Sequence, residues 1–485
     1  MDNLKDKTLK GVMWNLTERV GSRVIAFVPT LLLARLLDPE QFGLVAMLSL
    51  FMAVANVLLD SGFGIALIQK RDATYADECS IFYFNILVGG IVYLILFGLA
   101  PFIAGFFDQP ILTPLTRWLT LCVPVQSFSL IQLTLLARAL DFKTQVKANL
   151  AATLLAAFLG VAAAFGGLGV WSLVIQSVSN TLCSTLILWW LSAWRPAFIF
   201  SLSSLKGMFG FGSRLLLTNL VATFFDHIYQ VFIGKVFSAV SLGYYMRASS
   251  VRVLANDTIS FTLGRVLFPA LASIKDDLAR LQRGYRKFIL LATFVHFPVM
   301  CGLVVMAKPL FTLLFSEKWL EAVPLFQLMC LAALLVPLQM INLDVLKVKG
   351  CSDLVLRLEI IKRFLLVASI LVSYRWGIQA MLVGQVVLSV IWYYLNSYYS
   401  GILIEYPMRS QMLDILPSFL FSGLMGGAMF AAGYMLQSTH PLIQVVVLDA
   451  VGAGAYLSLQ TMIKSEALAE IVQMFKQFVV PRLAT

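Results

Sequence analysis

The sequence predicts an all-α polytopic membrane protein, and three observations support this fold class. Of the 485 residues, 60% are hydrophobic and only 13% are charged, and the mean hydropathy is +0.87. A soluble domain has about 25% charged residues, so a water-soluble core could not hide this much apolar surface. Apolar segments of the length that spans a bilayer as a helix recur along the whole chain. A soluble enzyme, a disordered protein and a nucleic-acid binder are therefore disfavoured.

The apolar segments number about fourteen, and short loops separate them. Each contains about 20 mostly apolar residues, which a transmembrane helix requires. In chain order the expected spans are 12–35, 41–66, 80–106, 113–137, 146–166, 169–192, 214–238, 243–271, 285–308, 321–346, 354–374, 377–400, 412–436 and 441–463. The gaps between them leave no room for a separate soluble domain. The tail after Lys464 has an amphipathic pattern, which predicts a helix on the membrane surface.

Loop charge predicts the orientation of the spans. Cytoplasmic loops of membrane proteins carry an excess of Lys and Arg. If the N-terminus is cytoplasmic, the loops on its side contain 21 basic residues and the loops on the opposite side contain 5. An odd number of spans would mix the two sets of loops. The sequence thus predicts an even number of spans, a multi-pass protein of the bacterial cytoplasmic (inner) membrane, and both termini in the cytoplasm.

Weak matches between the two halves predict an internal repeat. They occur in the same order at offsets of about 200 residues: Phe42-Gly43 with Leu242-Gly243, Gly64 with Gly264, and Pro114-Leu115 with Pro324-Leu325. Because each repeat has six spans, both have the same orientation, and such parallel repeats are related by an axis along the membrane normal. We therefore expect an N-lobe at 1–193 with helices 1 to 6, a cytoplasmic linker at 194–213, and a C-lobe at 214–400 with helices 7 to 12. A central cavity would lie between the lobes, and two extra helices and the tail would occupy 401–485.

Gly423 and Gly427 form a GxxxG pattern in the thirteenth span. Small residues at this spacing let two membrane helices approach closely. The pattern predicts close packing of this face against the fourteenth span.

Charged residues inside the spans are the candidate site residues. A charge at the bilayer centre costs at least about 2.5–3.5 kcal/mol, so it marks a cavity, a partner or an interface. The basic candidates for a cationic substrate cavity are Arg19, Arg23, Arg214, Arg252 and Arg265. Arginine suits anionic groups and phosphate geometry. Arg19 is close enough to the cytoplasmic face for snorkelling to be an alternative.

Acidic residues and one histidine in the spans are candidates for ion coupling. They are Asp60, Asp226, His227 and Asp257. For Asp60 and Asp226, an equally valid interpretation is a charge partner for a neighbouring arginine. His227 could carry a proton, or it could form an ordinary structural hydrogen bond. The sequence contains no Walker A motif, and its six cysteines lack metal-ligand spacing, so neither a cofactor nor a bound metal is expected.

Two segments resemble a known family. The first contains Gly11-Val12-Met13-Trp14 and then Leu33-Ala34-Arg35-Leu36-Leu37-Asp38-Pro39-Glu40-Gln41-Phe42-Gly43, and the second is Leu136-Ala137-Arg138-Ala139-Leu140-Asp141-Phe142-Lys143. They resemble bacterial polysaccharide transporters of the multidrug/oligosaccharidyl-lipid/polysaccharide (MOP) exporter superfamily, particularly the WzxC-like lipopolysaccharide and exopolysaccharide branch. The motifs cover the first 150 residues and are mainly structural.

The resemblance implies a non-enzymatic flippase that works by alternating access. Its substrate would be an oligosaccharide for O-antigen, capsule or exopolysaccharide, linked to undecaprenyl pyrophosphate. Implied partners are membrane lipid, a coupling ion (proton or sodium) and a polysaccharide polymerase complex, and no nucleic acid is expected.

Three alternatives stay open from the sequence. Two belong to the same superfamily: an ion-coupled multidrug antiporter, for which the fourteen spans are two too many, and a lipid II flippase. The third is a membrane oligosaccharide polymerase or ligase, although the expected outer loops are short and contain few His, Asp and Glu residues.

Overall fold

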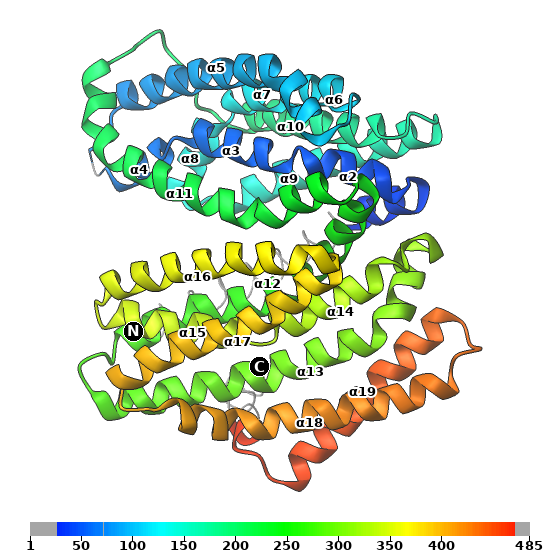
Figure 1. The fold of residues 1–485 in the computed structure, drawn as a ribbon. Coiled ribbons are helices and arrows are strands. Elements are labelled where there is room, and N and C mark those ends of the chain that lie inside the picture. Colours follow the sequence, from blue (N-terminus) through cyan, green and yellow to red (C-terminus); the bar gives the residue numbers. More distant parts are fainter. Residues whose placement is uncertain (1–26, 71, 471–485) are drawn as a thin grey trace, which may run out of the picture. The chain divides into compact units, whose positions relative to one another are not determined.

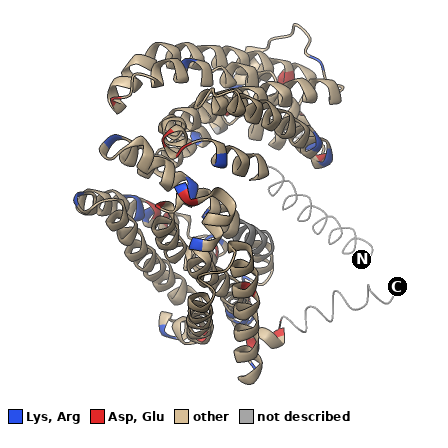
Figure 2. Ribbon diagram, turned by 90° about the vertical axis from the view of Figure 1, so that its right-hand side faces the viewer, with Lys and Arg blue, Asp and Glu red and all other residues tan. Residues whose placement is uncertain are grey.

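In a computed structural model, residues 27–70 and 72–470 are described, without the side chains of Phe211 and residues 257–266. Helices and loops, without strands, make up these residues (Figure 1). Charged residues are sparse along the ribbon (Figure 2). The chain forms two compact units, Met1–Met246 and Arg247–Thr485.

The first unit has Phe27–Leu36, a short apolar helix, as its first described helix. Its further helices are α2 (Pro39–Met47), α3 (Ser49–Asp60), α4 (Phe63–Gln69), α5 (Tyr75–Phe107), α6 (Leu112–Leu119), α7 (Cys122–Ser127), α8 (Leu130–Arg138), α9 (Phe142–Phe165), α10 (Trp171–Leu191), α11 (Leu202–Val236) and the first turns of α12 (Ala239–Ala272).

Polar side chains fix where the long helices of this unit begin. The Thr74 hydroxyl accepts a hydrogen bond from the Asp77 backbone N–H, and the Asp77 carboxylate accepts one from the Thr74 N–H, which is a capping box at the start of α5. Asp141 caps α9 through the Thr144 N–H at 3.1 Å. Asp141 belongs to the second segment that resembles the transporter family, so that segment contributes a helix cap.

Two spans of the first unit are interrupted. Between α3 and α4, Ser61 and Gly62 both have left-handed backbone conformations, with φ of 50° and 71°. The fourth span bends by 46° between Leu112–Ser127 and Leu130–Arg138. Interrupted helices free backbone groups inside a membrane and are tolerated where protein or a polar cavity satisfies them.

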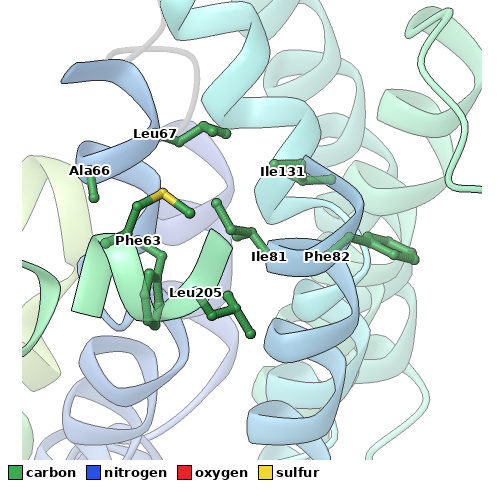
Figure 3. Close-up of a cluster of buried hydrophobic side chains, with 8 residues drawn as sticks. Phe63, Ala66, Leu67, Ile81, Phe82, Ile131 and Leu205 are labelled. Atoms are coloured by element: carbon green, nitrogen blue, oxygen red, sulfur yellow. The ribbon is translucent and has the colours of Figure 1, made fainter. Parts of the chain in front are cut away.

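A buried apolar cluster joins α4, α5, α8 and α11 (Figure 3). Phe63 and Leu67 of α4 pack with Ile81 of α5, Ile131 of α8 and Leu205 of α11. The side chains on the outer face of the unit are also apolar, and Phe102 of α5 is 74% exposed. Apolar residues on both the inner and outer faces are typical of a helix bundle that lies in lipid.

The second unit contains the rest of α12 and seven further α-helices. They are α13 (Leu278–Phe315), α14 (Ala322–Ala333), α15 (Val336–Val348), α16 (Ser352–Ser373), α17 (Ile378–Leu403), α18 (Met408–Met435) and α19 (Pro441–Met462). Apolar side chains of α13, α18 and α19 form one buried cluster, with Phe294, Met425 and Tyr456 among its members. The two extra C-terminal helices therefore pack on α13.

The all-α polytopic fold is confirmed. Within the described ranges, ten helices are long and apolar enough to cross a membrane, and the bent pair makes up to eleven. The segments expected as the eighth and eleventh spans form the 34-residue α12 and the 22-residue α16, which are not among these helices. Both are long enough, but their Arg, Lys, Asp and Glu residues lower their apolar character. The total of fourteen spans and the repeat remain predictions.

The expected role of Gly423 and Gly427 is wrong. A Cβ atom added at either position would have no atom within 4 Å apart from the neighbouring backbone of its own helix. The close contact between α18 and α19 uses Gly452 instead, where an added Cβ would lie 2.7 Å from the Met429 sulfur. The GxxxG spacing was correct for a shared helix face, but that face does not meet α19.

The starts of α2 and α12 cross in close backbone contact. A Cβ added at Gly43 would lie 1.7 Å from the carbonyl oxygen of Ala239, and one added at Gly243 would lie 1.9 Å from the carbonyl oxygen of Pro39. Pro39 and Ala239, like Gly43 and Gly243, are 200 residues apart. Gly43 thus contacts the residue equivalent to Pro39, and Gly243 contacts Pro39 itself. Reciprocal contacts of this kind occur between two segments related by a twofold axis. This geometry supports the predicted repeat.

Helix α11 begins at Leu202, inside the segment 194–213 that the sequence assigns to a linker. It packs on α2, α3, α4 and α5 and belongs to the first compact unit. The functional division into lobes at 1–193 and 214–400 stays a prediction.

Candidate functional site

Helices α3 and α11 lie side by side in opposite directions (Figure 1). At one end of the pair, the Ser49 hydroxyl of α3 donates a hydrogen bond to Oε1 of Gln230 in α11. At the other end, a Cβ added at Gly212 of α11 would lie 3.1 Å from the carbonyl oxygen of Ser61. Glycine is needed at Gly212 and Gly62 because the two backbones nearly touch there. This helix pair contains four of the predicted site residues, two toward each end.

Asp60 is the last residue of α3 and directly precedes the break at Ser61. Its side chain is half-buried and lies against Gly64, where an added Cβ would be 3.3 Å from Asp60 Oδ1 and 3.0 Å from Thr134 Oγ1. No basic side chain in the described parts of the chain forms an ion pair with Asp60. The predicted pairing of Asp60 with a neighbouring arginine is therefore not seen among these residues. An unpaired carboxylate at a helix break can take up a proton or a cation.

Arg214 lies near the same end of the α3–α11 pair as Asp60. Its backbone carbonyl accepts a hydrogen bond from Thr218, and its side chain is exposed. The guanidinium group is therefore available to an anionic ligand.

His227 and Asp226 lie toward the other end of the pair. His227 Nδ1 is 2.6 Å from Gln230 Oε1, which only accepts hydrogen bonds, so Nδ1 is the donor. The same Gln230 oxygen accepts the bond from Ser49, so Ser49, Gln230 and His227 form one polar chain. The Asp226 side chain is exposed. The sequence had singled out His227 but not its partners, which neutral polar residues in an apolar span could have indicated.

The candidates in the second unit lie on α12. Arg252 is half-buried and close enough to the Cys330 thiol for an electrostatic interaction. One turn earlier, Arg247 is buried, with its guanidinium 5.1 Å from the ring centre of Phe315 and 4.9 Å from that of Trp319. Cation–π contacts of this kind stabilise a buried arginine. The side chains of Asp257 and Arg265 on α12, and the whole of Arg19 and Arg23, lie outside the described residues.

A buried polar network in the second unit was not anticipated. Asn342 Oδ1 of α15 accepts hydrogen bonds from the Tyr285 hydroxyl of α13, at 2.6 Å, and from the Ser400 hydroxyl of α17. Nearby, Gln411 of α18 accepts from Ser397 at 2.9 Å. These neutral side chains satisfy each other's hydrogen-bonding groups, so the network links α13, α15, α17 and α18 without burying a charge. Polar residues inside apolar spans were the available signal.

This helical arrangement defines the class of the protein by its fold, which is that of known multi-helix membrane proteins. A lipid II flippase, MurJ, in an inward closed conformation superposes with a TM-score of 0.74 at 12% identity, covering 92% of this chain and 98% of that one. An inward-facing multidrug resistance transporter of the MATE family and MOP superfamily gives a TM-score of 0.59 at 14% identity, covering 79% of this chain and 96% of that one. At such identities the likeness establishes the fold.

The chain belongs to the polysaccharide biosynthesis protein family, whose family model matches residues 32–324. It is 27% identical to the teichuronic acid biosynthesis protein TuaB of Bacillus subtilis over 474 residues, which are 95% of this chain and 96% of TuaB. It is 26% identical to the lipopolysaccharide biosynthesis protein WzxC of Escherichia coli, with 76% of each chain covered. The succinoglycan biosynthesis transport protein ExoT of Rhizobium meliloti is 25% identical, with 67% of this chain and 65% of ExoT covered. The resemblance drawn from the sequence motifs is confirmed.

Proposed function

We propose that this chain is a flippase that moves a lipid-linked oligosaccharide unit for a surface polysaccharide across the bacterial inner membrane by alternating access. The observation that carries the proposal is the family match over 60% of the chain, residues 32–324, joined to the fold of a lipid II flippase. The two features together support a role in polysaccharide biosynthesis and a fold that can move a lipid-linked cargo. Its substrate would carry undecaprenyl pyrophosphate.

The chemistry of such a substrate requires a polar path. Neither a pyrophosphate nor a sugar crosses hydrocarbon unaided, because each would lose its hydrogen bonds to water. A cationic cavity replaces this hydration while the polyprenyl chain stays in lipid. We assign this cavity to Arg214 and Arg252, together with Arg19, Arg23 and Arg265. Guanidinium groups match phosphate oxygens in geometry and charge.

The two lobes at 1–193 and 214–400 would rock about the cavity, with both termini in the cytoplasm. A coupling ion, proton or sodium, could drive net export, since one charge moved across 100 mV contributes about 2.3 kcal/mol. Asp60, which forms no ion pair with the described residues and lies at the break between α3 and α4, is the principal candidate for this role. Asp226, His227 and Asp257 are the others. A polysaccharide polymerase complex would take up the flipped unit.

The first test is a leaflet assay in cells that lack this chain. An impermeant probe applied to spheroplasts would report lipid-linked oligosaccharide in the outer leaflet. We expect the wild-type chain to restore delivery and Arg252→Gln to slow it about tenfold, the effect of losing one charge-assisted contact. Arg375→Gln is the control, because Arg375 lies in an exposed loop turn of the same unit. Normal delivery without the chain would refute the flippase proposal and favour a later polymerase step or drug export.

The ion-coupling role has its own test. Asp60→Asn removes the charge and keeps the shape of the side chain. If Asp60 binds the coupling ion, the variant loses the dependence of transport on a proton or sodium gradient. If the variant keeps that dependence, Asp60 is not the coupling site, whatever the change in overall rate.

A further inference from the structure

A cavity of about 400 Å³ lies between α5 and α6 in the first unit. Tyr93 and Phe97 of α5 form one side, and Thr113, Arg117 and Trp118 of α6 form the other. The short α6 packs against α5; both helices are labelled in Figure 1. The cavity thus combines three aromatic rings, a hydroxyl and a guanidinium, the mixture typical of small-ligand sites.

Arg117 is the charged group of this cavity. Its guanidinium carbon lies 4.4 Å from the ring centre of Phe97. Its Nε is buried and has no hydrogen-bond partner in the described part of the chain. No carboxylate within residues 27–70 and 72–470 forms an ion pair with it. Phe97 orients the guanidinium, but no carboxylate among the described residues neutralises its positive charge.

The position of the cavity along α5 places it in one leaflet. The 33-residue α5 is about 50 Å long, whereas the hydrocarbon core is about 30 Å thick. Between Glu78 and Asp108 this helix has no charged residue, and Phe97 precedes Asp108 by eleven residues, about 16 Å. The Lys235–Asp108 ion pair, at 2.7 Å, marks that end as aqueous, and loop charges predict that it faces outward. Arg117 therefore lies in the outer half of the bilayer, where a long guanidinium side chain can extend toward the headgroups.

We propose that this cavity binds the phosphate group of a lipid in the outer leaflet. Arg117 would pair with the phosphate oxygens, and Thr113 would donate a hydrogen bond from the rim. The lipid chain would lie along the exposed apolar side chains of α5, of which Leu94 is 68% exposed. The lipid is either an anionic phospholipid or the diphosphate-linked cargo after flipping. The second source rests on the proposed function, and the first does not.

The experiment uses the full-length purified chain in detergent micelles. Native mass spectrometry counts retained phosphatidylglycerol against phosphatidylcholine. Tryptophan fluorescence, compared between the wild type and Trp118→Phe to isolate the contribution of Trp118, reports binding of farnesyl diphosphate, a short polyprenyl diphosphate. We expect Arg117→Gln to weaken binding at least tenfold, and Arg117→Lys to stay within about threefold of wild type because it keeps the charge. The control Arg375→Gln also removes a guanidinium that contacts an aromatic ring, that of Tyr374, and should bind as wild type does.

The outcomes separate the two lipid sources. Weakened binding of phosphatidylglycerol alone identifies a membrane phospholipid, and weakened binding of farnesyl diphosphate alone identifies the cargo. Equal retention of phosphatidylglycerol and phosphatidylcholine by the wild type, with no farnesyl diphosphate binding, overturns the proposal.

A second measurement needs no variant of Arg117. Photoreactive phosphatidylglycerol and photoreactive farnesyl diphosphate should label peptides within residues 93–121 of the wild type, and labelling only elsewhere by both probes contradicts the site. If the chain binds lipid phosphate but does not restore delivery in the leaflet assay, the lipid site is supported and the flippase proposal is refuted. If the chain restores delivery but binds no lipid phosphate, the flippase proposal is supported and the lipid site is refuted.

Discussion

Replacing Gly43 with alanine tests the crossing of α2 and α12. The added Cβ would lie 1.7 Å from the Ala239 carbonyl oxygen and 2.5 Å from its carbonyl carbon. A carbon–oxygen contact needs about 3.3 Å, so the two backbones must separate by about 1.5 Å. Overpacking costs about 1–3 kcal/mol, and here it reaches the upper limit because backbone atoms cannot rotate away. Alanine regains about 1 kcal/mol of helix propensity, which leaves a net loss of about 2 kcal/mol.

Thermal unfolding of the purified chain in detergent measures this loss. A compact unit of this size loses about 2–4 °C in Tm for each kcal/mol, so Gly43→Ala should lower the Tm by about 4–8 °C. Gly98→Ala in α5 is the matched control, because an added Cβ there meets nothing within 4 Å. The control should unfold at or above the wild-type temperature.

The double variant Gly43→Ala/Gly243→Ala makes the test sharper. Because both added methyl groups open the same crossing, the second substitution should cost much less than it does alone, a coupling of about 1 kcal/mol or more. Fully additive losses, or a Gly43→Ala protein as stable as the wild type, would refute the reciprocal backbone contact.

Two further predictions concern a helix cap and an ion-pair cluster. Asp141→Ala should lower the free energy of unfolding by about 1 kcal/mol and speed hydrogen exchange in the first turn of α9. In the wild type, hydrogen bonds from the Thr144 hydroxyl and N–H lower the pKa of Asp141 below the ordinary aspartate value of 3.8. The cap should therefore persist as the pH falls through 3.8 and weaken only at lower pH. Arg286 binds Asp414 at 2.9 Å and Glu466 at 2.7 Å, so Arg286→Gln should cost about 1 kcal/mol and release the segment after α19 to limited proteolysis, less so at high salt. Unchanged exchange in the first variant, or unchanged cleavage in the second, would contradict these roles.

The sequence predicted the architecture well because bilayer physics acts on each helix separately. Twenty apolar residues define a span whatever its neighbours are, so the predicted limits match most observed helices. Motif residues also had local causes: the Asp38 and Gln41 side chains form a capping box, and Pro39 begins α2. Such features depend on a few adjacent residues, which a sequence displays directly.

Features that depend on which helix faces meet could not be read from the sequence. Gly423 and Gly427 share a helix face, but the spacing does not say whether that face meets protein or lipid. Arg117 escaped notice because its cavity is formed with Phe97, a residue twenty positions earlier on another helix. His227 was visible as a polar residue in a span, whereas its hydrogen bond through Gln230 to Ser49 required the packing of α3 on α11.

Charge compensation separates the intramembrane residues by role. Lys362 is buried but bonds to Glu359 at 2.9 Å, and Arg247 is buried over two aromatic rings. Both are explained by their own surroundings. Asp60 and Arg117 differ, because among the described residues neither forms an ion pair, although an uncompensated charge inside a membrane-spanning segment is costly. Because a folded protein is stable by only a small margin, an unpaired charge of this kind is best tolerated where a bound ligand compensates it. Asp60 needs a cation or a proton, and Arg117 needs an anion, which agrees with the ion-coupling and lipid-phosphate roles proposed for them.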